Sequence, residues 1–104
     1  TVGATRLTVS GTADINPEGD SCHVGDFTAQ TLRTYEIVRA ILSSRELTWT
    51  EVKRATAYIR EPSDRAAFDA LVESGALPDL RAVVITATVC RDDLLFELEL
   101  DASL

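Results

Sequence analysis

The alternation of residues 96–101 constrains the fold of this chain more than any other feature of its sequence. Apolar and acidic residues alternate there: the apolar ones are Phe96, Leu98 and Leu100, and the acidic ones are Glu97, Glu99 and Asp101. Because successive side chains of a strand point to opposite faces, this segment predicts a strand with one apolar face and one acidic face. Such a strand buries one face in a core and offers the other to solvent, a ligand or a partner.

Three further segments have the alternation of strands. They span residues 6–13, 52–60 and 81–90. A tight connection at residues 91–93 predicts that the third strand forms a hairpin with the last one. The polar turn residues at 16–21 predict a long loop after the first strand.

The same alternation predicts which strand residues face the core. The expected apolar sets are Leu7, Val9, Gly11 and Ala13, then Ala55, Ala57 and Ile59, then Val83, Ile85, Ala87 and Val89. Arg81 falls in phase with this last set unless it precedes the strand or a bulge intervenes. The opposite face collects Arg6, Thr8, Ser10, Thr12, Arg54, Thr56, Tyr58, Arg60, Thr86, Thr88, Cys90, Glu97, Glu99 and Asp101.

Two amphipathic helices complete the pattern. Asp26 is the expected N-cap of a helix that runs to about Arg45. Its apolar side carries Leu32, Tyr35, Val38 and Leu42, flanked by Phe27 and Ile41. A second helix begins near Pro62 and stops at Gly75. The order β-α-β-α-β-β predicts a two-layer α+β domain over residues 1–104, with both helices on one face of the sheet.

The polar face of this sheet has two interpretations. It is either solvated, as is common for antiparallel sheets, or an oligomer interface with clefts between subunits. Arg54 or Arg60 can pair with Glu97 or Glu99 across the strands. The short hydroxyl side chains on this face would let another backbone approach closely, which favours the interface.

Composition excludes several classes of partner. A net charge of −7 and an isoelectric point near 4.5 argue against a nucleic-acid surface, which needs clustered cations. No apolar run in the given sequence is long enough to span a membrane, and none of it has the basic-then-apolar pattern of a signal segment, so a cytoplasmic protein is expected. Cys22 and Cys90 have no metal-site spacing with His23, and no metal or cofactor is expected. The two cysteines could form one disulfide, but free thiols are expected in a cytosolic chain.

Several blocks, in order, resemble the RidA/YjgF (L-PSP endoribonuclease-like) superfamily. They are Val-Ser-Gly-Thr-Ala at 9–13, His-Val-Gly-Asp at 23–26, Ala-Gln-Thr at 29–31, Ala-Tyr-Ile at 57–59 and Cys-Arg-Asp-Asp-Leu-Leu-Phe-Glu-Leu-Glu at 90–99. The second and last blocks are also similar to the C-terminal domain of chorismatases. The resemblance implies a chorismate-mutase-like fold with a mixed sheet, a homotrimer, and ligand sites in clefts between subunits. The family has a further strand before Arg6 that the given sequence lacks.

The resemblance also implies roles for individual residues. Arg81 falls where deaminases of the family have an essential arginine, whose guanidinium clamps a substrate carboxylate. Glu97 falls where the family has a glutamate that positions water or handles a proton. The candidate ligand-binding residues are Ser10, Gly11, Tyr58 and Cys90. Structural alternatives exist for several of these positions: an ion pair for Glu97, core packing for Cys90, and a core or interface anchor for Tyr58.

Three functional classes follow from this sequence. The first is a RidA-like deaminase that hydrolyses a reactive enamine or imine carboxylate, with Arg81 on the carboxylate and Glu97 directing water. The second is a chorismatase-type lyase or hydrolase domain, completed by a further domain. The third is a non-catalytic trimeric module that binds a ligand or partner, which is favoured if Arg81 points into the core.

Overall fold

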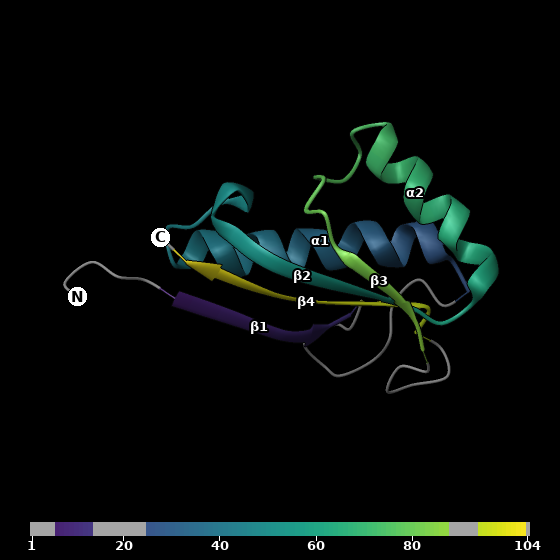
Figure 1. Ribbon diagram of the computed structural model, residues 1–104, viewed down its shortest axis with the longest axis horizontal. Helices are drawn as coiled ribbons and strands as arrows, with labels where there is room; N and C mark the ends of the chain where they lie inside the picture. Colours follow the sequence, from purple (N-terminus) through teal and green to yellow (C-terminus); the bar gives the residue numbers. More distant parts are fainter. Residues whose placement is uncertain (1–5, 14–24, 88–93, 104) are drawn as a thin grey trace.

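A computed structural model describes residues 6–13, 25–87 and 94–103, which form a four-stranded sheet with two α-helices packed against it (Figure 1). The strands are β1 (Arg6–Thr12), β2 (Val52–Ile59), β3 (Val83–Thr86) and β4 (Phe96–Ser103). The helices are α1 (Phe27–Ser44) and α2 (Arg65–Glu73), with 3-10 turns η1 (Trp49–Glu51) and η2 (Pro62–Asp64). The predicted two-layer α+β class is confirmed. None of the described helices is both long and apolar enough to cross a membrane.

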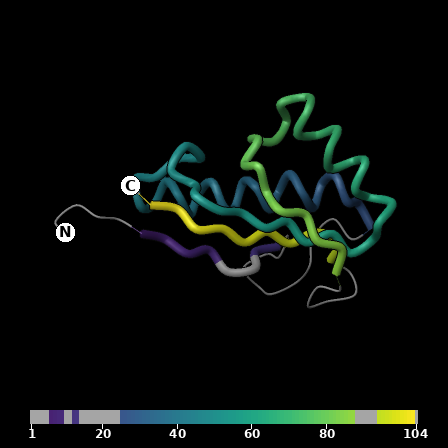
Figure 2. The backbone as a smooth tube through the Cα atoms, in the orientation of Figure 1, coloured from purple at the N-terminus to yellow at the C-terminus, as the bar shows by residue number. Residues whose placement is uncertain are grey.

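The last strand, β4, lies inside the sheet rather than at its edge (Figure 2). The strand order is β1-β4-β2-β3, in which β4 is antiparallel to both of its neighbours and β3 is parallel to β2. The predicted hairpin between the third and last strands is therefore wrong. Helix α2 connects β2 to β3, and a crossover of this kind returns the chain parallel to the strand it left.

The core lies between the helices and one face of the sheet. On β4, Phe96 and Leu98 are fully buried and Leu100 is 3 % exposed, as the alternation predicts. Ala57 and Ile59 on β2 are buried beside them. Burying each large apolar side chain contributes about 1.5–3 kcal/mol, so this strand supplies much of the stabilisation.

Phe96 joins both helices to the sheet through its ring. Its centroid lies 5.9 Å from that of the Tyr35 ring in α1 and 5.7 Å from that of the Phe68 ring in α2, both in stacked arrangements. The Phe27 ring lies 6.0 Å away in an edge-to-face arrangement. Stacked and edge-to-face pairs of this kind add about 0.5–1.5 kcal/mol beyond the buried area. The ring of one β4 residue thus fixes how the helical layer sits on the sheet.

The predicted start of α1 and end of α2 agree with the structure, whereas α2 begins at Arg65, after the 3-10 turn that starts at Pro62. The Asp26 carboxylate caps α1 by accepting a hydrogen bond of 3.0 Å from the Ala29 backbone N–H. Helix α2 ends at Glu73, and Gly75 follows with a φ of +83°, a conformation that glycine adopts without strain.

A buried glutamine links α1 to the start of β4. Gln30 is 0 % exposed, and its Oε1 atom accepts a hydrogen bond of 2.8 Å from the Leu95 backbone N–H. The Leu95 carbonyl accepts a bond of 3.1 Å from the Arg60 backbone N–H, just beyond β2. Both backbone groups of Leu95 are therefore satisfied, and the chain enters β4 in a defined register.

The faces of β3 are the reverse of those predicted. Val83 is 59 % exposed and Ile85 is 40 % exposed, whereas Val84 packs against the core. Pairing places Val83 beside Thr56 and Ile85 beside Tyr58, on the face away from the helices. The prediction failed because apolar residues occupy consecutive positions of this strand and so lie on both of its faces. Alternation alone therefore does not show which face is buried. The strand is also shorter than predicted, and residues 88–90 lie outside the described ranges.

A register irregularity changes the faces at the end of β1. The β1–β4 register shifts before Thr12, which pairs with the core residue Leu98. Ala13 packs in a separate small cluster with Leu94 and Tyr58. The predicted assignment of Thr12 to the polar face and Ala13 to the main core is therefore wrong, because a bulge inserts one extra residue and reverses the alternation.

We expect Gln30→Leu to lower the free energy of unfolding by about 1–3 kcal/mol, because it leaves the Leu95 N–H buried without an acceptor. Urea denaturation followed by circular dichroism measures this change. Glu36→Leu, on the exposed side of the same helix, is the control and should stay within about 0.5 kcal/mol of the unmodified protein. Equal stabilities of the two variants would show that the Gln30 bond is unimportant.

Candidate functional site

The sheet face away from the helices, here called the open face, carries the candidate site. Among described residues it presents Thr8, Arg54, Thr56, Tyr58, Val83, Ile85, Glu97, Glu99 and Asp101. Polar side chains occupy its middle, and exposed apolar side chains occupy the β3 edge. This mixture differs from the uniformly polar face that the sequence predicts.

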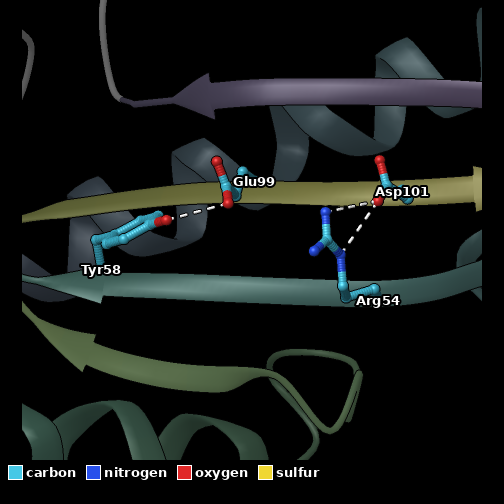
Figure 3. Close-up of polar contacts among 4 residues, drawn as sticks. All are labelled: Arg54, Tyr58, Glu99 and Asp101. Carbon is cyan, nitrogen blue, oxygen red and sulfur yellow. Dashed lines mark hydrogen bonds and ion pairs between the residues drawn. The ribbon is translucent and has the colours of Figure 1, made fainter.

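Two contacts between β2 and β4 hold carboxylates on the open face (Figure 3). Arg54 donates from Nε and Nη2 to Asp101 Oδ2, at 3.1 and 2.8 Å. The Tyr58 hydroxyl donates to Glu99 Oε1 at 3.0 Å. The Arg54 side chain is 71 % exposed, so its ion pair contributes at most about 1 kcal/mol.

The predicted pairing of Arg54 or Arg60 with Glu97 or Glu99 is wrong. The β2–β4 register places Arg54 opposite Asp101. Arg60 lies beyond the end of β2, where its Nε atom approaches Glu61 at 3.9 Å. The position of the register, which the sequence does not reveal, decides which carboxylate meets the cation.

Glu97 differs from the other two carboxylates of β4. It lies opposite Tyr58 in the register and is half-buried. Within the described part of the chain it has no ion-pair partner. Burial, followed by the negative charge of Glu99, raises the pKa of Glu97 above its ordinary value. A carboxyl group in such surroundings holds a proton more readily and suits general acid chemistry.

The neighbouring groups have pKa shifts of different origin. A hydrogen bond from Thr8, assisted by Arg54, lowers the pKa of Asp101. The bond to Glu99 raises the pKa of Tyr58, which keeps its phenol protonated. The three carboxylates of β4 are therefore chemically distinct although they lie on one face of one strand.

Two hollows open on this face within the described residues. One of about 80 Å³ lies between Thr8, Thr56 and Glu99, and one of about 310 Å³ lies beside Arg6, Lys53 and Arg54. Glu97 lines neither of them. Small-molecule sites usually enclose about 300–1,000 Å³, so a ligand beside Glu97 needs a further wall, which the described residues do not supply.

Arg81 lies on the other side of the sheet from Glu97. It precedes β3 with a φ of 52°, is exposed, and donates its backbone N–H to Asp79 Oδ1 at 3.0 Å. It borders a groove of about 240 Å³ beneath α2, which Asp69 also lines. Arg81 does not point into the core, but one copy does not bring it together with Glu97.

The structure describes three of the four remaining predicted site residues. Tyr58 lies on the open face beside Glu97, as expected. Ser10 and Gly11 belong to β1. Cys90 lies outside the described residues. No group of His, Cys, Asp and Glu within the described ranges is arranged to hold a metal ion.

Sequence reasoning missed the apolar part of the open face. Val83 and Ile85 project there because β3 pairs in parallel with β2. The run of apolar residues at 82–85 was the available signal, since continuous apolar runs are typical of parallel strands.

Comparison with known proteins gives relatives of two kinds. No family model matches the sequence. A 3-hydroxybenzoate synthase of Streptomyces hygroscopicus is 29% identical over 103 residues, which cover 90% of this chain and 30% of that protein. A chorismatase structure is 21% identical with a TM-score of 0.79, covering 93% of this chain and 32% of that one.

Members of the Rid family have the same fold. The Rid-family protein YyfB of Yersinia pestis is 25% identical with a TM-score of 0.74, covering 95% of this chain and 78% of that one. RidA of an Antarctic Psychrobacter species is 16% identical with a TM-score of 0.79, covering 98% of this chain and 86% of that one.

By its fold this chain is a RidA-like α+β domain. Its predicted resemblance to the RidA/YjgF superfamily and to the chorismatases is confirmed. The chain spans 30% of the length of the synthase and 32% of the chorismatase, but 86% of the Psychrobacter RidA.

We expect the substitutions Glu97→Gln and Asp101→Asn to change stability in opposite directions. The raised pKa of Glu97 means that its ionised form opposes folding, so Glu97→Gln should stabilise the protein at neutral pH. This gain should vanish as the pH falls below the unfolded value of about 4.3. The lowered pKa of Asp101 means that Asp101→Asn should destabilise at neutral pH, with the loss disappearing in acid.

Urea unfolding at neutral pH and at about pH 3 measures both effects. Each variant serves as the control for the other, since both replace one carboxylate of β4 by its amide. A destabilised Glu97→Gln variant at neutral pH would contradict the burial of this carboxyl group.

Proposed function

We propose that this chain is the RidA-like domain of a chorismatase-type enzyme, and that Glu97 donates the proton that starts cleavage of the enolpyruvyl ether of chorismate. The observation that carries this proposal is the similarity to 3-hydroxybenzoate synthase along 90% of the chain. The matching fold of a chorismatase supports it.

The surroundings of Glu97 suit this chemistry. An enol ether is cleaved after a proton reaches its methylene carbon, and water then adds to the resulting cation. The adduct collapses to pyruvate and a ring alcohol. A carboxyl group whose pKa is raised by burial supplies such a proton, while the charge of Glu99, held in place by Tyr58, favours the protonated form of Glu97.

The rest of the active site would come from outside this domain. The hollow of about 80 Å³ beside Glu99 is too small for a substituted ring with two carboxylates, and Glu97 does not line the hollow of about 310 Å³ beside Arg54. Exposed Val83 and Ile85 give this face an apolar border that suits a covering domain. Cations for the substrate carboxylates would then lie on that domain or at its contact with Arg54.

We expect the full-length protein to release pyruvate from chorismate, and Glu97→Gln to reduce the rate by about 10²–10⁴-fold, as for loss of a general acid. A coupled lactate dehydrogenase assay measures the pyruvate. Glu36→Gln, on the exposed side of α1, is the matched control and should keep the full rate. No pyruvate, or an unaffected Glu97→Gln variant that remains folded, would disprove the proposal.

A second candidate is the RidA-type hydrolysis of an enamine or imine carboxylate by a homotrimer. The guanidinium of Arg81 has no ion pair within the described residues and borders the groove beneath α2. Glu97 lies on the opposite side of the sheet, so the two residues can share a substrate only if different copies supply them. The exposed apolar edge of the open face would form part of the contact between copies.

For this candidate we expect ammonia release from an enamine generated in situ, and its loss in Arg81→Ala by at least about 100-fold, because the bidentate clamp is removed. Arg33→Ala is the control, since that arginine is exposed on α1 and does not line this groove. Ile85→Glu should dissociate the oligomer in light scattering and abolish activity together. Activity of a monomeric variant would contradict a site shared between copies.

A further inference from the structure

We propose that a second groove, on the helical layer, binds a small aromatic carboxylate. The groove has a volume of about 210 Å³ and runs between α1, η1 and the segment after α2. Its walls are formed by Leu32, Tyr35, Glu36, Arg39, Trp49, Ala76, Leu77 and Pro78. This groove lies on the opposite side of the sheet from Glu97, so it is separate from the Glu97 site proposed above. It adjoins the groove beneath α2, with which it shares Tyr35 and Pro78.

The Tyr35 hydroxyl is the first feature that calls for a ligand. The residue is 4 % exposed, yet its hydroxyl has no hydrogen-bond partner among the described residues. Every fully enclosed side-chain oxygen or nitrogen in the described ranges does have a partner, so the Tyr35 hydroxyl must reach an opening. Tyr35 lines this groove and the adjoining one beneath α2. Burial raises the pKa of Tyr35, so at neutral pH its hydroxyl is protonated and can donate a hydrogen bond to a ligand.

The charge of the groove favours an anion. Arg39 lies four residues after Tyr35, so both side chains project from the same flank of α1. Glu36 also lines the groove, but its carboxylate forms an ion pair with Arg33, with 3.1 Å between Glu36 Oε2 and Arg33 Nη1. Arg39 has no ion pair within the part of the chain that is described. A planar guanidinium next to a phenol is a good pair of donors for one carboxylate.

The walls of the groove favour a flat ring. The Trp49 ring is half-buried and lies 5.7 Å from the Tyr35 ring, tilted by 48°. Leu32 and Pro78 close the sides with apolar surface. A volume of about 210 Å³ is below that of typical drug-sized sites but is large enough for a single ring with one substituent. An aromatic ring on Trp49 would place its carboxylate toward Tyr35 and Arg39.

Trp49 supplies a direct test because it is the single tryptophan of the sequence. We expect titration with benzoate to produce a saturable change in its fluorescence, confirmed by equilibrium dialysis with labelled benzoate. Tyr35→Phe keeps the ring but removes the donor, and should weaken binding roughly tenfold. Arg39→Gln should weaken it by at least about tenfold.

Matched controls make the result specific. Arg45→Gln removes an exposed cation at the C-terminal end of the same helix, outside the groove, and should leave benzoate binding unchanged. Benzamide, which has the same shape without the charge, should bind at least about tenfold more weakly. Absence of saturable benzoate binding in dialysis would overturn the proposal. Binding by Tyr35→Phe and Arg39→Gln as tight as that of the unmodified protein, or equal binding of benzamide, would overturn it as well.

The two proposals fail independently. Tyr35→Phe and Arg39→Gln should keep the rate of pyruvate release, because neither residue belongs to the open face. Glu97→Gln should bind benzoate with unchanged affinity. Loss of benzoate binding in Glu97→Gln would place the ligand on the open face and overturn the second site.

Discussion

The insertion of β4 between β1 and β2 is the constraint on which the rest of this structure depends. Both edges of β4 are paired with neighbouring strands, so its backbone is satisfied on each side. Its inward residues form the centre of the core, and the Phe96 ring contacts both helices. Its outward residues are the carboxylates of the candidate site. One strand therefore determines the packing of the helical layer and the chemistry of the open face.

The carboxylates of β4 show how a sheet can differentiate identical groups. Asp101 is held by Arg54, Glu99 accepts from Tyr58, and Glu97 is half-buried without an ion-pair partner in the described chain. These differences arise from the neighbours that the β2 register supplies. RidA-like folds host more than one chemistry, so function has to be argued from such local surroundings rather than from the fold.

The helical layer has features of its own that the sheet does not explain. Tyr35 packs its ring on Phe96 in the core while its hydroxyl opens onto grooves on the outer side. Neither apolar periodicity nor the family resemblance indicates this arrangement, because a tyrosine at a core position of a helix is usually a packing residue. Whether the Tyr35 hydroxyl has a hydrogen-bond partner depends on how α1, η1 and the segment after α2 pack together.

The sequence by itself determined the features that depend on neighbours along the chain. The alternation in β4, the Asp26 cap, the stop at Gly75 and the α+β class were all predictable, because side-chain periodicity and capping act over a few residues. Only the tertiary structure decided the strand order, the exposed face of β3, the pairing of Arg54 with Asp101 and the separation of Arg81 from Glu97. These depend on which strand lies beside which, and pairing is settled by the crossover helices and the shared core.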